Sequence, residues 1–131
     1  MMKNKINSLK QHPLFSEEQG LNSLGDKVLL REMAELLITE LMTIDKPALQ
    51  AAFERQACEQ LGQVAHKIKG GALYCGAQRL VEACVILESL TRDKEASASF
   101  MAVTEAYGLL DETVEATNKA IQAWLQQTES I

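Results

Sequence analysis

Residues 100–124, FMAVTEAYGLLDETVEATNKAIQAW, carry the clearest structural pattern in this chain of 131 residues. Two sets of mostly apolar residues recur there every seven positions: Phe100, Tyr107, Val114 and Ile121, and Val103, Leu110, Thr117 and Trp124. A seven-residue repeat places both sets along one side of an α-helix, where they form a seam that packs against other helices. The stretch therefore predicts a helix of about 25 residues in a helical bundle.

A second run with a helical pattern covers residues 27–55. Apolar residues recur there at spacings of three and four, which marks one apolar face: Leu30, Met33, Leu37, Leu41, Ile44, Ala48 and Ala52. Pro47 lies inside this run and predicts a kink or a split, because proline lacks the backbone N–H and clashes with the preceding turn. Asp45 is the expected N-cap of the second half.

Two further helices are expected between these long runs. The pattern predicts helices over residues 59–73 and 77–91, and Gly76 is expected to end the first of them. The polar residues 92–99 that follow predict a loop. Four helices with apolar stripes and short connections predict an all-α protein, an antiparallel four-helix bundle.

The N-terminal part predicts shorter structure. Residues 1–13 are polar and suggest a loose leader or the end of a linker, so we expect a leader over residues 1–15 and a folded domain over residues 16–131.

Capping signals follow this leader. Ser16 with Gln19 three positions later matches a capping box and predicts a short helix. Gly25 is suited to end that helix, and Asp26 to cap the next one. One or two short helices are therefore expected before the bundle.

Composition excludes several classes of protein. The chain has 13 basic and 18 acidic side chains and a net charge of −5, so overall charge does not favour a nucleic-acid binder. Only 2 prolines and 7 glycines are present, too few for a turn-rich β-sandwich or barrel. No charge-free stretch approaches the roughly 20 residues of a membrane span.

The cysteines indicate a reducing compartment. Cys58, Cys75 and Cys84 are odd in number and form no CxxC pair, so neither a disulfide scaffold nor a zinc site is expected. We expect small apolar side chains and a cytoplasmic location.

One histidine stands out in the helix predicted after residue 58. At 100° per residue, His66 points about 140° away from the core face, so it is expected at the surface. That core face comprises Leu61, Val64, Ala65, Ile68 and Ala72. An exposed histidine by itself usually has no special role.

The neighbours of His66 suggest a function. Gly62 and Gly70 lie one turn on either side of it, and a glycine inside a helix costs about 1 kcal/mol relative to alanine. We interpret the pair as clearance for the backbone of another protein, to which Gly71 adds. Lys69 places an ammonium group beside whatever the imidazole holds.

The next helix supplies a carboxylate. Glu88 lies at the edge of an apolar stripe formed by Ala77, Leu80, Val81, Cys84 and Leu87. If the two helices pack antiparallel, Glu88 can accept a hydrogen bond from Nδ1–H of His66 and leave Nε2 free as a nucleophile. The alternative is a surface carboxylate paired with Arg92, four residues on.

Residues 65–72, AHKIKGGA, followed by Gly76-Ala77 and Leu80, resemble the signature of histidine-containing phosphotransfer (HPt) domains, as in the C-terminal modules of bacterial hybrid sensor kinases. The shared pattern is His-x-x-Lys-Gly, then Gly-Ala, then Leu.

The resemblance implies roles for four residues. His66 is the phosphoacceptor, Lys69 stabilises the phosphoryl group, Gly70 makes room for the partner, and Glu88 orients the imidazole, as Gln or Glu does in relatives. The chain departs from the pattern mildly at Gly71, Tyr74 and Cys75. The last two are expected to affect the choice of partner, and none of the three removes a chemical group that the transfer requires.

The implied function is that of a phosphocarrier. His66 exchanges a phosphoryl group with the aspartate of receiver domains of response regulators, in a relay that includes a sensor histidine kinase. No cofactor is expected in the chain itself, because Mg²⁺ comes with the receiver. We expect a monomer without kinase activity of its own, free-standing or as the cytoplasmic C-terminal part of a membrane-bound hybrid kinase.

The expected partner-binding surface surrounds His66 and comprises Gly62, Lys67, Gly70, Gly71, Leu73 and Arg79. Leu73 lies about two turns beyond His66 on nearly the same face, although closure of the helix end onto the core would explain it equally well. Residues 60–81 contain three basic side chains and no acidic one, which places a positive patch around His66.

Two other classes of protein were weighed. The dimerisation helices of histidine kinases resemble His-Glu-x-x-x-Pro, whereas Lys67 follows His66 here and no proline is near. A helical interaction module in which His66 is incidental is the main alternative.

Overall fold

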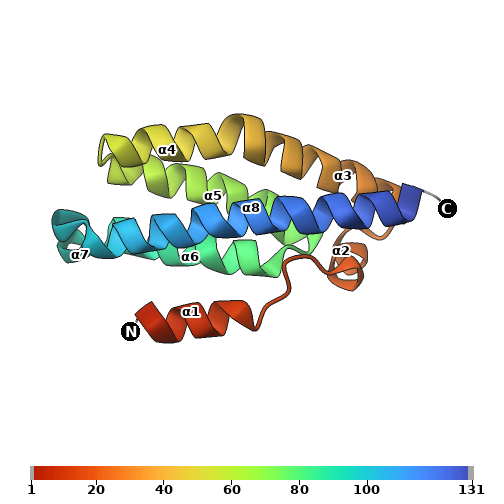
Figure 1. The fold of residues 1–131 in the computed structure, drawn as a ribbon, viewed down its shortest axis with the longest axis horizontal. Coiled ribbons are helices and arrows are strands. Elements are labelled where there is room, and N and C mark those ends of the chain that lie inside the picture. Colours follow the sequence, from red (N-terminus) through yellow and green to blue (C-terminus); the bar gives the residue numbers. More distant parts are fainter. Residues whose placement is uncertain (1, 130–131) are drawn as a thin grey trace.

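The computed structural model describes residues 2–129, and every regular element in that range is helical. The long elements are α3 (Lys27–Glu40), α4 (Lys46–Glu54), α5 (Cys58–Cys75), α6 (Gln78–Arg92) and α8 (Met101–Glu129). α4 continues α3, so the long elements form a bundle of four rods, and consecutive rods run in opposite directions (Figure 1). The predicted antiparallel bundle is confirmed.

Local signals in the sequence explain where several helices begin and end. The side chain of Ser16 accepts a hydrogen bond from the backbone N–H of Gln19 at the start of α2 (Glu17–Leu24). Asp26 accepts one from the N–H of Leu29 at the start of α3. Gly25 ends α2 in the left-handed conformation, as predicted.

Gly76 fixes the turn between α5 and α6. Its φ of 79° is left-handed, and a Cβ at this position would collide with the backbone oxygen of Ser16. Only glycine fits both restraints. The turn therefore seats the start of α2 against the end of α5.

The α-helix is interrupted next to Pro47, as predicted, but the junction contains no cap. One turn of π-helix, Leu41–Asp45, joins them, and Pro47 lies in the first turn of α4. The helical path thus continues through the junction, because the wider turn accommodates the proline. Asp45 keeps helical angles, φ −75° and ψ −45°, and its side chain caps nothing, so the predicted N-cap at Asp45 is wrong.

Two segments expected to be irregular are helical. Met2–Lys10 forms α1, and its Leu9 is only 2 % exposed, so the interpretation of this stretch as a loose leader is wrong. Residue 1 lies outside the described residues. Lys94–Ser99 forms α7 rather than a loop, because the carboxylate of Asp93 accepts hydrogen bonds from the N–H groups of Glu95 and Ala96.

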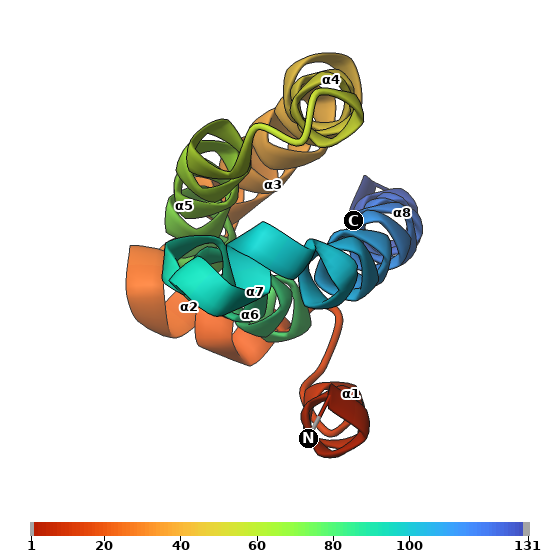
Figure 2. The ribbon, with the colours of Figure 1, turned by 90° about the vertical axis from the view of Figure 1, so that its left-hand side faces the viewer.

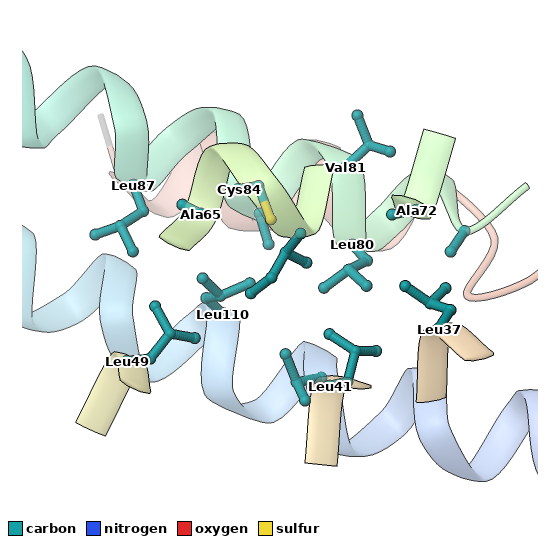
Figure 3. Close-up of a cluster of buried hydrophobic side chains, with 14 of the residues drawn as sticks. Leu37, Leu41, Leu49, Ala65, Ala72, Leu80, Val81, Cys84, Leu87 and Leu110 are labelled. Carbon is teal, nitrogen blue, oxygen red and sulfur yellow. The ribbon is translucent and has the colours of Figure 1, made fainter. Parts of the chain in front are cut away.

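The core lies between the four rods and consists of side chains from every long element. Figure 3 draws 14 of them and labels ten: Leu37, Leu41, Leu49, Ala65, Ala72, Leu80, Val81, Cys84, Leu87 and Leu110. Small residues on α5 allow α5 and α6 to pack closely. The end-on view of Figure 2 shows the two helices next to each other. This packing sets the outer face of α5 directly beside that of α6.

The three cysteines are free thiols. Cys75 and Cys84 are buried, and burial raises the pKa of Cys75 to about 11, so these two act as small apolar side chains. Across residues 2–129, no helix combines the length and the apolar character needed to cross a membrane.

Candidate functional site

His66 lies on the outer face of α5. Its side chain is 67 % exposed, while Ala65 and Ile68 on the opposite face are buried in the core. The predicted orientation is confirmed. An imidazole with this exposure is accessible to another protein.

Glu88 is the buried anchor of the site. This residue of α6 is only 4 % exposed, and its Oε2 lies 3.2 Å from Nδ1 of His66. Its Oε1 lies 2.8 Å from Nζ of Lys69, and Nη2 of Arg92 lies 3.2 Å from Oε2. Both pairings that the sequence suggested for Glu88 therefore occur together.

The surroundings keep Glu88 ionised. Burial by itself raises the pKa of the carboxyl group, but the hydrogen bonds from Lys69 and His66 and the nearby positive charge lower it. The net result is a pKa below the ordinary value of 4.5. At neutral pH the group is a carboxylate, which can only accept hydrogen bonds.

The ionised state of Glu88 determines where His66 carries its proton. A carboxylate 3.2 Å from Nδ1 requires a donor there, so the proton of the neutral ring lies on Nδ1. Nε2 then keeps its lone pair and lies at the far side of the ring from Glu88. The arrangement presents a fixed, unprotonated nitrogen to any partner that approaches α5.

Arg92 belongs to this site although its sequence pattern indicates only a partner of Glu88. It also lines a pocket of about 470 Å³ that includes His66 and Gln63. Its side chain is 77 % exposed. Only the spacing of four residues from Glu88 hinted at this position, since the sequence does not reveal which face of α6 borders His66.

The structure explains the three glycines near His66 in different ways. Gly70 is exposed, and a Cβ there would meet nothing within 4 Å, which leaves space for a partner. A Cβ at Gly62 would lie 2.7 Å from Oγ1 of Thr91, so this glycine allows α5 and α6 to approach each other. A Cβ at Gly71 would lie 3.3 Å from Cδ1 of Leu37 in α3, a tight contact. Clearance for a partner therefore explains Gly70, while packing explains Gly62 and Gly71.

Lys67 is engaged in the bundle rather than free at the surface. Its Nζ lies 2.6 Å from Oδ1 of Asp45, whose side chain is only 5 % exposed. The hydrogen bond and the charge of Asp45 raise the pKa of Lys67. The ion pair ties α5 to the π-helical turn, which the sequence analysis did not foresee.

Replacing Lys67 by alanine leaves the buried Asp45 carboxylate without this partner. We expect the free energy of unfolding in urea to fall by on the order of 2 kcal/mol, because an unpaired buried charge is costly. The double variant Lys67→Ala/Asp45→Asn should recover much of the loss. A Lys67→Ala variant as stable as one carrying Lys119→Ala on the exposed surface of α8 would contradict this role.

Arg79 also differs from its expected place. Its Nε donates to the carbonyl of His12 at 2.9 Å and its Nη2 to that of Lys10 at 3.2 Å. It lies nine residues before Glu88, about 13 Å along α6. The guanidinium therefore holds the end of α1 and is not at the edge of the His66 site.

Exposed apolar residues extend the outer face of α5. Leu73 is 55 % exposed and Tyr74 is 56 % exposed, so Leu73 does not close the helix end onto the core. Both lie about two turns beyond His66. Together with the open space at Gly70, they form an apolar extension of the histidine surface.

The comparison with protein families agrees with this geometry. The family model of the Hpt domain matches residues 28–130, which is most of the chain and includes α5 and α6. Comparisons with curated proteins and with solved structures gave no match. Hpt domains take part in phosphotransfer in two-component signalling, in phosphorelays with kinases and receiver domains. With a helical bundle that carries an exposed histidine, and with a family match over most of its length, the chain belongs to the Hpt domain family.

Proposed function

We propose that this protein is a phosphocarrier in which Nε2 of His66 accepts a phosphoryl group from the aspartate of one receiver domain and donates it to another. The observation that carries the proposal is the contact between the buried carboxylate of Glu88 and Nδ1 of the exposed imidazole. This contact holds the ring in one orientation with its nucleophilic nitrogen outward.

The transfer exchanges one bond for another. The lone pair of Nε2 forms the N–P bond while the bond between phosphorus and the aspartate oxygen breaks, and its electrons return to the aspartate carboxylate. The ring keeps its Nδ1 proton and gains positive charge, which Glu88 stabilises from 3.2 Å. The reverse sequence passes the group to the next receiver.

Lys69 and Arg92 place two positive charges near His66. Lys69 and Arg92 both contact Glu88 in the unphosphorylated protein. Because the transition state of phosphoryl transfer spreads negative charge over three oxygens, an ammonium group one turn from His66 stabilises it. Mg²⁺ comes with the receiver in this proposal, and the chain carries no glycine-rich loop that would bind ATP.

We expect Lys69→Ala to slow phosphoryl transfer by roughly tenfold to a hundredfold, because it removes a positive charge from the transition state. Lys69→Arg keeps the charge and should retain most of the rate. The helical circular dichroism spectrum should stay the same in both variants. A Lys69→Ala variant that has lost its helical signal would mean that this lysine supports the fold instead.

The receiver approaches over α5 and α6. Gly70 leaves room for its backbone, and the exposed Leu73 and Tyr74 offer an apolar surface beside the histidine. Substantial apolar contact next to a charged site is typical of protein interfaces.

A transfer assay tests the proposal. Receiver domains encoded in the same genome are phosphorylated with acetyl phosphate, freed of excess reagent, and mixed with the full chain. We expect at least one of them to transfer label to this protein, in a linkage that is labile in acid and stable in base. If no receiver labels the chain, the alternative applies. The protein is then a helical interaction module in which His66 is incidental.

A further inference from the structure

Three neighbouring hollows lie between His66 and α1, on either side of residues of α6. The pocket at His66 and a second hollow of about 230 Å³ beside Lys69 share Arg92 as a common wall. That second hollow shares Val85 and Ser89 with a third hollow of about 240 Å³ between α6 and α1. Neighbouring hollows share lining residues, so the surface around the histidine and the surface at α1 lie next to each other across α6.

α1 is fixed in place on this surface. Leu9 is buried, and Arg79 of α6 binds the backbone carbonyls of Lys10 and His12. A guanidinium at the C-terminal end of a helix is favourable because the carbonyls there lack partners within the helix. In Figures 1 and 2, α1 lies outside the four-rod bundle, alongside α6. It forms a ridge on the outside of the bundle that Leu9 anchors to the core.

The exposed side of this ridge is basic and polar. Lys5 and Ser8 are exposed and line the third hollow, opposite the half-exposed Val85 of α6. Basic and acidic side chains lie together along these hollows: Lys5 with Glu82 at the third, and Lys69 and Arg92 with Glu88 at the second. The exposed Lys5 is the charge on α1 that an acidic side chain of a partner could contact at the edge of this surface.

We propose that α1 is a second wall of the receiver-binding surface, so that Lys5 and Ser8 contact the same receiver domain that exchanges a phosphoryl group with His66. The inference rests on the proposed function. The family match begins at residue 28, so α1 lies outside the part of the chain that the family model describes. α1 therefore contributes to the choice of receiver, while the matched part carries the chemistry.

The experiment measures the initial rate of transfer from the best phosphorylated receiver at several receiver concentrations. Lys5→Glu should raise KM about threefold to fivefold and leave kcat unchanged, because a charge at the edge of an interface mainly affects association. The increase should shrink with added salt. Ser8→Trp, which fills the third hollow, should raise KM by roughly the same factor without this dependence on salt.

The matched control is Lys119→Glu, which makes the same charge change on the exposed surface of α8 and should leave KM at the wild-type value. Thermal unfolding, monitored by circular dichroism, shows whether each variant is folded. If Lys5→Glu lowers the midpoint of thermal unfolding, the KM of Ser8→Trp alone tests the inference. If both α1 variants have the wild-type KM, the inference about α1 is wrong, and the proposed function is unaffected. A wild-type chain that no receiver labels overturns the proposed function itself.

Discussion

We expect His66→Gln to abolish phosphoryl uptake from every phosphorylated receiver domain, because the amide of glutamine has no nucleophilic nitrogen. His66 is largely exposed, so its replacement should change the free energy of unfolding by no more than about 0.5 kcal/mol. The readout is the amount of acid-labile label per chain at the end of the reaction. Loss of label with an unchanged unfolding curve assigns the acceptor to this side chain.

The chain offers a matched control, because its only other histidine is His12. His12→Gln should be labelled to the same final extent as the wild type. Acid-labile label that persists in His66→Gln would place the acceptor elsewhere and contradict the account of the site.

The second large effect is expected for Glu88→Ala. Without the carboxylate, the imidazole is free to rotate and to carry its proton on Nε2, so transfer should slow about a hundredfold. Glu88→Gln should fall between this variant and the wild type, because its amide oxygen can still accept a hydrogen bond from Nδ1. The measurement is the single-turnover rate at saturating receiver, which separates chemistry from binding.

The stability of Glu88→Ala shows whether Glu88 positions the imidazole or supports the fold as a whole. Lys69 and Arg92 can turn to solvent when Glu88 is removed, so Glu88→Ala leaves no buried charge behind. We therefore expect it to unfold with nearly the wild-type midpoint in urea. A Glu88→Ala variant that transfers phosphate at the wild-type rate would show that the contact with His66 has no part in the reaction.

The sequence predicted the elements whose signals are local. The seven-residue repeat before Trp124, the capping box at Ser16 and the glycines at 25 and 76 each act within a few residues, and the structure has a helix or a helix end at each of them. The face of α5 that carries His66 follows from helical geometry alone. For the same reason, its exposure could be predicted without knowledge of the tertiary structure.

Such local patterns do not predict contacts between segments that are distant in the sequence. Asp45 looked like an N-cap, but the π-helical turn directs its carboxylate to Lys67, 22 positions away. Arg79 looked like part of a charged surface, but its partners are carbonyls 67 and 69 positions earlier in the chain. The packing role of Gly62 likewise depends on Thr91 of the next helix. Each of these depends on how helices pair, which no single segment encodes.

The central claim is that Glu88 holds the proton of the neutral His66 ring on Nδ1. It is tested most directly by a two-bond ¹H–¹⁵N correlation spectrum of the unphosphorylated chain at about pH 8, where imidazole rings are neutral. The account predicts a protonated Nδ1 and a bare Nε2 for His66 in the wild type, with this preference lost in Glu88→Ala. A wild-type spectrum in which Nε2 carries the proton would contradict it.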